Sequence, residues 1–336
     1  MRFAINGFGR IGRAIFRIAF FDEFDCLYIN EPNAEIEDIK YFLKYDSLYG
    51  TFEPDIEIDK LNNKLIIKNE TKTLETRISH FDNVDEFVNA IPKGTVVIES
   101  NGCIENIDYY LNNPKNNAIF TLSSEKIKNE IISGVNDIDV KVIPKNGVVS
   151  GSICDTVAIA PILQCVYSCY EIKETLITTM HPALSYQKVI DNYVEPGINR
   201  SLGRQYIDSI IPKRTSAEKI LKRHFPNNVI RCLSFRIPTE SVCAADITLT
   251  SNEKIDHKKI IEKLKNIKHI SFSYEDVVSI DFKASKSSAI VDMRWFELIN
   301  DNILKIVIWY DNEYGYSSRI LELIKLYFNQ SGDYYG

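Results

Sequence analysis

The sequence predicts an α/β protein of two domains: a first domain with a doubly wound, mostly parallel sheet, and an α+β domain with a mixed or antiparallel sheet. The chain has 336 residues, long enough for two domains of about 150 residues each. Over roughly the first 125 residues, strand-like and helix-like segments alternate, as they do in parallel sheets. Long strand-like segments dominate the remainder, which is typical of an α+β domain.

The expected elements follow from apolar periodicity. In the first part, we expect strands at Arg2–Asn6, Cys26–Asn30, Asn62–Asn69, Thr95–Glu99 and Asn117–Leu122, and helices at Ile11–Phe21 and Ile36–Lys44. In the second part, we expect strands at Lys173–Met180, Val229–Pro238, Val242–Thr250 and Ile303–Tyr310, and helices at Cys154–Tyr167, Glu253–Leu264 and Ser317–Phe328.

The composition excludes several classes of protein. Hydrophobic residues make up 45% of the chain and charged residues 26%, with a net charge of −6, which is ordinary for a globular protein. A mildly acidic chain lacks the basic field that non-specific nucleic-acid binding requires, so we expect no nucleic-acid partner. No segment approaches the ~20 continuous apolar residues of a membrane span, so we expect no membrane partner.

The seven cysteines are odd in number and scattered along the chain. This usage predicts reduced thiols and, with an N-terminus that lacks a signal-peptide pattern, a cytoplasmic protein. Cys165 and Cys169 are four residues apart, but no histidine stands near them at ligand spacing. We therefore expect no metal site.

A GxGxxG turn follows the first expected strand; it consists of Gly7, Phe8, Gly9, Arg10, Ile11 and Gly12. In a strand–turn–helix context, the glycines allow a tight turn, close approach of a pyrophosphate and close packing of helix on strand. Glu31 ends the next strand, nineteen residues after Gly12. Its carboxylate suits a ribose diol and repels a 2′-phosphate, which favours NAD over NADP. Arg10 or Lys40 could still favour NADP, and a glycine-rich turn without a ligand is the alternative.

A second candidate site combines a cysteine and a histidine. Cys154 begins an expected helix, where the helix dipole stabilises a thiolate. His181 directly follows a strand in an apolar setting, whereas the other four histidines have more polar neighbours. The two side chains could form a nucleophile–base pair, although a buried structural cysteine is the commoner use of such a residue.

Three motifs resemble those of glyceraldehyde-3-phosphate dehydrogenases: NGFGRIGR at Asn6–Arg13, YDSLYG at Tyr45–Gly50 and WYDNEYGYSSR at Trp309–Arg319. Shorter matches surround Cys154, His181 and Phe235–Thr239, and the resemblance runs over essentially the whole chain. It implies a homotetrameric, NAD-dependent dehydrogenase of an aldose phosphate, with inorganic phosphate as a second substrate where it cleaves the intermediate. It also implies an NAD-binding domain at 1–153, completed by a C-terminal helix at 317–336, and a catalytic domain at 154–316.

The resemblance also implies roles for individual residues. Cys154 would be the nucleophile, His181 the general base and Arg236 the ligand of the substrate phosphate. The remaining substrate-binding residues would be Thr156, Thr215 and Ser216. NAD would be held by the residues of the GxGxxG turn together with Glu31, Asn101, Gly102 and Asn312.

The chain departs from the family pattern around the expected phosphate sites. Ile153 and Asp155 stand where the family has hydroxyl residues, and Leu184 and Tyr186 replace threonines. Lost donors weaken an anion site and a carboxylate repels phosphate. Asp155 either faces the site or only supports the first turn of its helix. In the first case it also opposes the lowering of the thiol pKa by the helix and by a protonated histidine.

Two alternatives to glyceraldehyde-3-phosphate oxidation stay open. The segments His181–Leu184, Gln187–Asp191, Ser279–Phe282 and Ser288–Asp292 resemble erythrose-4-phosphate dehydrogenases, which release an acid by hydrolysis. A non-catalytic NAD-binding relative is the other alternative. The joint presence of Cys154, His181, Arg236 and Asn312 argues against it, because cofactor binding alone needs no thiol–imidazole pair.

Overall fold

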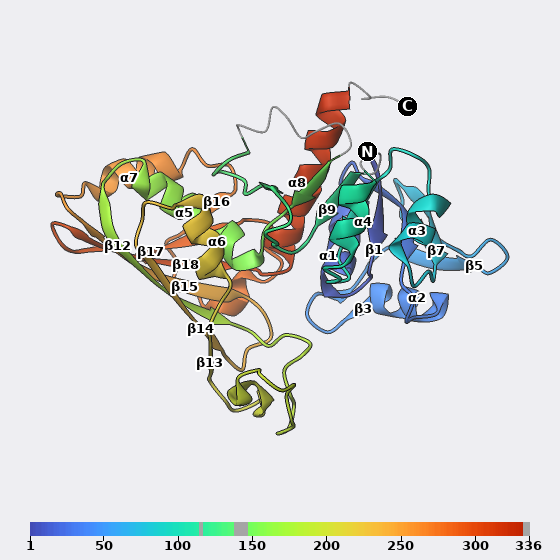
Figure 1. The fold of residues 1–336 in the computed structure, drawn as a ribbon, viewed down its shortest axis with the longest axis horizontal. Helices are drawn as coiled ribbons and strands as arrows, with labels where there is room; N and C mark the ends of the chain where they lie inside the picture. Colours follow the sequence, from blue (N-terminus) through green and yellow to red (C-terminus); the bar gives the residue numbers. More distant parts are fainter. Residues whose placement is uncertain (114–116, 138–146, 332–336) are drawn as a thin grey trace. The chain divides into compact units, whose positions relative to one another are not determined.

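The computed structural model describes residues 1–113, 117–137 and 147–331, and these form two compact units (Figure 1). The first unit takes its described residues from 1–132, 136–153 and 317 onward. The second comprises Ser133–Val135 and Cys154–Tyr316. Among the helices of the described residues, none is long and apolar enough to cross a membrane.

The first unit is built on a nine-stranded sheet. Its strands, in spatial order, are β10 (Asn129–Glu130), β11 (Val148–Ser150), β9 (Asn117–Phe120), β8 (Val96–Glu99), β1 (Arg2–Asn6), β2 (Asp25–Asn30), β7 (Thr73–Ser79), β6 (Lys64–Lys68) and β5 (Asp55–Asp59). Pairing is parallel from β10 to β7, whereas β7, β6 and β5 form an antiparallel meander. A separate hairpin joins β3 (Tyr45–Asp46) to β4 (Gly50–Thr51).

Helices cover both faces of this sheet. Alternate residues of a strand point to opposite faces, so each face presents its own side chains to a layer of helices. They are α1 (Arg10–Phe21), α2 (Ile36–Lys44), α3 (Val84–Ala90), α4 (Asn106–Asn112) and α8 (Tyr314–Ser331). In β1, Ile5 faces α1, where a Cβ on Gly12 would lie 3.3 Å from its side chain. The preceding Ala4 joins an apolar cluster with Phe87 of α3 and Tyr110 of α4. The prediction of a doubly wound Rossmann domain is confirmed.

The C-terminal helix α8 packs on the parallel part of this sheet. The Tyr327 hydroxyl donates to the carbonyl of Gly147, at 2.8 Å, directly before β11. Gly151 follows β11 and faces Ile320 so closely that a Cβ there would collide with the isoleucine. The residues of α8 from Ser317 onward therefore belong to the first unit.

The second unit is built on a seven-stranded mixed sheet. In spatial order the strands are β13 (Ile211–Lys213), β14 (Ile230–Arg236), β12 (Ile172–His181), β15 (Cys243–Ser251), β18 (Ile303–Tyr310), β17 (Ala289–Asn300) and β16 (Ile270–Ser273). The helices are α5 (Cys154–Tyr167), α6 (Ala217–His224), α7 (His257–Leu264) and the 3₁₀ turns η1 (Arg200–Gly203) and η2 (Ser279–Phe282). Pairing is antiparallel except between β12 and β14 and between β16 and β17, which confirms the predicted α+β architecture.

Several elements differ from the sequence prediction. The helices α3, α4 and α6 and the strands β5, β7, β10, β11, β13, β16 and β17 were not predicted. The helix expected from Glu253 begins at His257, because the Asp256 side chain accepts from the Lys258 amide at 3.0 Å and caps it there. The strand expected to stop at Met180 includes His181.

A buried carboxylate joins three elements of the first unit. Glu99, at the end of β8, accepts hydrogen bonds from Asn6 of β1 at 3.0 and 3.1 Å. Asn106 and Tyr110 of α4 donate to it at 3.0 and 2.7 Å. Burial raises the pKa of Glu99, and these three donors oppose the shift. The paired ends of β1 and β8 are thereby tied to each other and to α4, directly before the glycine turn.

Removal of one donor should loosen this junction. We expect Tyr110→Phe to lower the free energy of opening at β8 by about 1.5–3 kcal/mol, because the buried carboxyl group loses its shortest hydrogen bond. Native-state hydrogen exchange at the β8 amides measures the change. Tyr41→Phe, at an exposed position of α2, is the control. A shift no larger than that of the control would contradict the proposed role of Glu99.

Candidate active site

The glycine turn of the first unit leaves an open backbone cradle. Gly7 has φ +93°, a conformation that favours glycine, and a Cβ there would collide with the backbone of Asn101. A Cβ on Gly12 would collide with the carbonyl of Gly7, whereas one on Gly9 would meet nothing within 4 Å. The turn therefore meets the Asn101–Gly102 segment, and its middle glycine is open to a ligand. These residues fit a dinucleotide pyrophosphate.

Glu31 lies directly beside this turn. Its Oε2 accepts from the Phe8 amide at 2.8 Å, and its Oε1 accepts from the Asn33 amide at 3.3 Å. The carboxylate is only partly buried, so it can also accept from ribose hydroxyls. Arg10 of the same turn pairs with Asp46, at 2.6 Å between Nη1 and Oδ2. The YDSLYG motif thus supplies the partner of Arg10.

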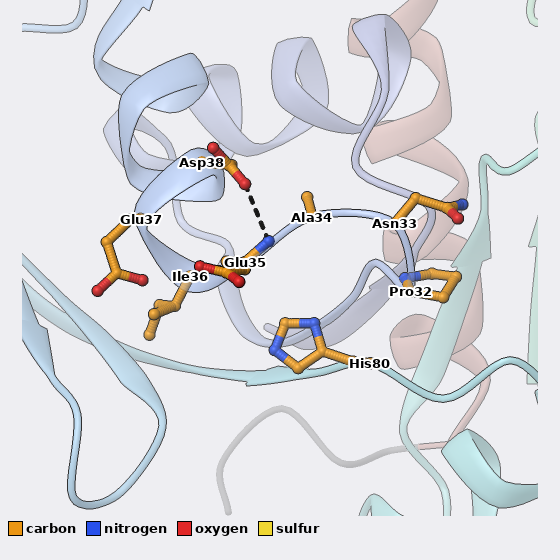
Figure 2. Close-up of a pocket in the computed structure, with 8 residues that line it drawn as sticks. All are labelled: Pro32, Asn33, Ala34, Glu35, Ile36, Glu37, Asp38 and His80. Carbon is orange, nitrogen blue, oxygen red and sulfur yellow. Dashed lines mark hydrogen bonds between the residues drawn. The ribbon is translucent and has the colours of Figure 1, made fainter.

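A pocket of about 530 Å³ opens directly after Glu31 (Figure 2). It is lined by Pro32, Asn33, Ala34, Glu35, Ile36, Glu37, Asp38 and His80. His80 lies across it from the start of α2, and its Nδ1 is 3.0 Å from the carbonyl oxygen of Glu31. Three acidic side chains line the pocket, which makes it unfavourable for a phosphate group.

In the second unit, the paired strands β12 and β14 bring His181 and Arg236 side by side. Cys154 is the first residue of α5, and its Sγ lies 3.7 Å from Nε2 of His181. Ser152, two residues earlier, has φ +60°, and this strained turn directs the chain into the helix. The structure therefore brings together the cysteine and histidine that the sequence indicated.

The imidazole of His181 is held in one tautomer. Its Nδ1 lies 2.8 Å from the carbonyl oxygen of Pro182. A carbonyl can only accept, so Nδ1 carries the proton and Nε2 presents a lone pair to Cys154. Burial lowers the pKa of His181, and the charge of Arg236 adds to this while Asp155 opposes it. The ring is a neutral base near pH 7.

The thiol of Cys154 is also held in its neutral form. Burial and the charge of Asp155 raise its pKa well above the ordinary value, and Arg236 only partly opposes them. This direction is opposite to the expectation that the helix N-terminus stabilises a thiolate at this position. Burial is the largest cause of the raised pKa of Cys154, and the charge of Asp155 is the second.

Asp155 faces the site and is almost fully buried. Its Oδ1 accepts from the Tyr310 hydroxyl at 2.9 Å and lies 3.7 Å from the Cys154 sulfur. Its Oδ2 accepts from the Thr215 hydroxyl at 3.3 Å. Of the two roles considered for Asp155, this geometry favours the one within the site, since the carboxylate lies beside the thiol.

Arg236 carries unsatisfied hydrogen-bonding capacity. It is buried, and its Nε and Nη1 have no hydrogen-bond partner among the described residues. Its Nη2 donates to the Tyr186 hydroxyl at 3.4 Å, and Lys213 donates to the same hydroxyl at 2.7 Å. Burial raises the pKa of Tyr186, but these two cations lower it further than burial raises it. The two cations and the open guanidinium edge suit an anion.

The other predicted substrate residues lie differently. Thr156 is fully buried within α5, and Ser216 is exposed at the start of α6. The hydroxyl of Thr215 is engaged by Asp155 and the Ala217 amide. Asn312, the second residue after β18, is buried.

Two residues of the second-unit site were missed by sequence reasoning. Lys213 is the first of two adjacent basic residues directly before Thr215, and this charge doublet was the available signal. Tyr310 lies within the Trp309–Arg319 motif, and only its contact with Asp155 reveals its role.

A dinucleotide-type turn in one unit and a thiol–imidazole pair in the other are together typical of a dehydrogenase that uses a nicotinamide cofactor and a cysteine. Comparison with known families agrees. Residues 1–107 match the NAD binding domain of glyceraldehyde 3-phosphate dehydrogenase, and residues 153–312 match its C-terminal domain.

Relatives match over nearly the full chain. A glyceraldehyde-3-phosphate dehydrogenase from Schistosoma mansoni is 31% identical over 95% of each chain. One from Pleurotus sajor-caju is 32% identical over 98% of each chain. A cytosolic one from Antirrhinum majus is 31% identical over 96% of this chain and 97% of its own. The chain belongs to the glyceraldehyde-3-phosphate dehydrogenase family and is an NAD-dependent oxidoreductase.

The charge of Asp155 should control the acidity of the thiol. We expect Asp155→Asn to shift the pH profile of Cys154 alkylation to lower pH by about one unit, because a neutral amide no longer disfavours the thiolate. Iodoacetamide labelling with mass-spectrometric identification of Cys154 measures it. Asp246→Asn is the matched control, since Asp246 pairs with Lys305 in the same sheet. An unchanged pH profile of Cys154 alkylation in Asp155→Asn would show that the charge of Asp155 does not control the acidity of the thiol.

Proposed function

We propose that this protein oxidises glyceraldehyde 3-phosphate with NAD through a thioester on Cys154. The observation that carries the proposal is the 3.7 Å approach of the Cys154 sulfur to the lone-pair nitrogen of His181. Erythrose 4-phosphate oxidation is the alternative. The glyceraldehyde-3-phosphate dehydrogenase names of the relatives above favour the first substrate.

The neutral thiol and imidazole form a nucleophile and its base. The Cys154 sulfur adds to the aldehyde carbon as the thiol proton passes to Nε2 of His181. The resulting imidazolium and the Cys154 amide can stabilise the oxyanion that forms. NAD, when bound, accepts the hydride from this carbon, and a thioester to Cys154 remains. The Nδ1 bond to Pro182 keeps Nε2 directed at the sulfur throughout.

Arg236 and Lys213 would bind the phosphate of the substrate. The free Nε and Nη1 of Arg236 offer a bidentate edge, and Lys213 adds a second charge beside it. In this assignment, the Tyr186 hydroxyl holds both cations in place where the family has a threonine.

In the first unit, the glycine turn, Glu31, Asn101 and Gly102 would hold NAD, and in the second unit Asn312 would contribute. Selectivity against NADP follows from the carboxylate of Glu31 and from the pairing of Arg10 with Asp46. The acidic pocket next to Glu31 disfavours a 2′-phosphate as well.

The thioester is cleaved by inorganic phosphate or by water. Asp155 occupies the position of a family hydroxyl and engages Thr215, so an incoming phosphate meets a negative charge and one donor fewer. We therefore infer a weak dependence on phosphate. Initial rates on glyceraldehyde 3-phosphate and erythrose 4-phosphate, each with and without phosphate, test this. A faster phosphate-independent rate on erythrose 4-phosphate would favour the alternative function, and no NAD reduction on either aldehyde would favour a non-catalytic protein.

A homotetramer in the cytoplasm is part of the proposal. Large apolar side chains are exposed along the segment after His181, and Tyr193 retains 94% of its accessible surface. Further exposed apolar residues lie on the strands of the second sheet: Leu176, Leu233, Trp295 and Ile299. Such surfaces are typical of subunit contacts. A cytoplasmic location is supported by the relatives from Antirrhinum majus and Pisum sativum, whose names include "cytosolic".

Cys154→Ser should abolish oxidation, because a hydroxyl is a far weaker nucleophile than a thiol near neutral pH. We expect kcat to fall by more than about a hundredfold, with NAD affinity retained by the first unit. NADH absorbance and calorimetric titration with NAD measure the two quantities. Cys169→Ser, at the partly exposed cysteine beyond the end of α5, is the control. Activity within about tenfold of the parent, or ~1.4 kcal/mol of barrier, would exclude the thioester mechanism.

Arg236→Leu should discriminate between phosphorylated and unphosphorylated aldehydes. We expect kcat/KM to fall about a hundredfold for glyceraldehyde 3-phosphate and little for glyceraldehyde, because only the former loses a buried charge pair. Arg231→Leu on the same strand is the control, since Arg231 is exposed and pairs with Glu218. Equal losses on both substrates would show that Arg236 does not bind the phosphate.

A further inference from the structure

The start of α5 and the end of β12 bring three different metal-ligating side chains together. Within the described part of the chain, Cys154, Asp155 and His181 form a group whose ligand atoms all lie within 4.8 Å of one another. The sulfur is 3.7 Å from His181 Nε2 and 3.7 Å from Asp155 Oδ1. Sequence spacing could not reveal this group, because His181 is 27 residues from Cys154.

These separations are close to those of a tetrahedral metal centre. With a metal–sulfur bond of about 2.3 Å and a metal–nitrogen bond of about 2.0 Å, tetrahedral ligand atoms lie about 3.5 Å apart. Both distances from the sulfur are therefore within a few tenths of an ångström of the required value. The ligand atoms of Asp155 and His181 lie within 4.8 Å of each other, so these two side chains must approach slightly when a metal binds.

The surrounding groups already orient the ligands. Nδ1 of His181 donates to the Pro182 carbonyl, an arrangement typical of histidines that bind metals through Nε2. Tyr310 and Thr215 donate to the two oxygens of Asp155 and restrict its carboxylate. The imidazole is thus oriented before any ion arrives and the Asp155 carboxylate is confined near it, which lowers the entropic cost of binding. Cys154 is partly exposed, so an ion can reach it.

We propose that Cys154, Asp155 and His181 form a reversible, inhibitory Zn²⁺ site. A thiolate with an imidazole and a carboxylate suits zinc, whereas magnesium and calcium require oxygen ligands alone. On binding, the zinc–sulfur bond replaces the S–H bond of Cys154, and the thiol proton passes to solvent. His181 contributes the Nε2 lone pair, Asp155 one oxygen, and water completes the tetrahedron. No group is oxidised or reduced.

Bound zinc would remove the nucleophile and its base at once. The sulfur electron pair and the Nε2 lone pair are both engaged by the metal, so neither can act on an aldehyde. Asp155 is the ligand that distinguishes this chain, because the family has a hydroxyl residue there. The inference depends on the positions of these three side chains and not on the proposed substrate.

Zinc titration of the chelator-treated full-length protein tests the site. We expect one equivalent of Zn²⁺ to bind by isothermal calorimetry, and Asp155→Asn to weaken binding at least about tenfold, as expected for the loss of a ligand. Asp155→Thr, which restores the hydroxyl of the family, should weaken it similarly. Asp246→Asn should bind zinc as the parent does. Circular dichroism and NAD titration verify that each variant is folded.

Cobalt provides a readout independent of activity. We expect Co²⁺ to give a thiolate-to-cobalt charge-transfer band in the near ultraviolet. Addition of Zn²⁺ or of a chelator should abolish this band. The Cys154→Ser variant should lack the band, whereas the Cys103→Ser variant should retain it. Absence of saturable zinc binding, equal affinity in Asp155→Asn, or a cobalt complex without the thiolate band would each overturn the proposal. Dehydrogenase activity measured in the presence of a chelator tests the proposed function separately. This activity does not depend on whether the protein binds zinc.

Discussion

The hydrogen bond between Tyr310 and Asp155 determines the geometry of the second-unit site. It joins the end of β18 to the first turn of α5 and so fixes the residue that follows Cys154. With Asp155 held on one side and His181 held by Pro182 on the other, the sulfur of Cys154 lies 3.7 Å from both. The raised pKa of Cys154 and the proposed zinc site both depend on this arrangement.

The parts of the fold that could be predicted are those with local signals. The glycine turn, Glu31 and their flanking elements were found because the motif, the strand and the helix lie within about thirty residues of chain, the length of a βαβ unit. The strand β7 was missed because Thr76 appears polar in the sequence. It is fully buried, and its hydroxyl donates to the carbonyl of Cys26 at 2.7 Å. The strand β17 was missed because Asp292 interrupts its apolar pattern. This carboxylate can be buried because Arg294 and Trp309 donate hydrogen bonds to it.

The second-unit site could be predicted only in part. Cys154 and His181 stood out through their places at a helix start and a strand end, but their proximity depends on long-range pairing that no spacing encodes. Lys213 and Tyr310 reach the site from strands that follow Cys154 by about sixty and over a hundred and fifty residues. The position of Asp155 was left open by sequence reasoning, because a first-turn side chain can point toward the site or toward solvent.

The neutral state of Cys154 has a consequence for the redox chemistry of the protein. Peroxides react with thiolates far faster than with thiols, and the first product is a sulfenic acid. Burial and the neighbouring carboxylate keep the sulfur protonated near pH 7, so oxidants find little of the reactive form. Burial and the charge of Asp155 therefore disfavour the oxidation of Cys154 as well as its deprotonation.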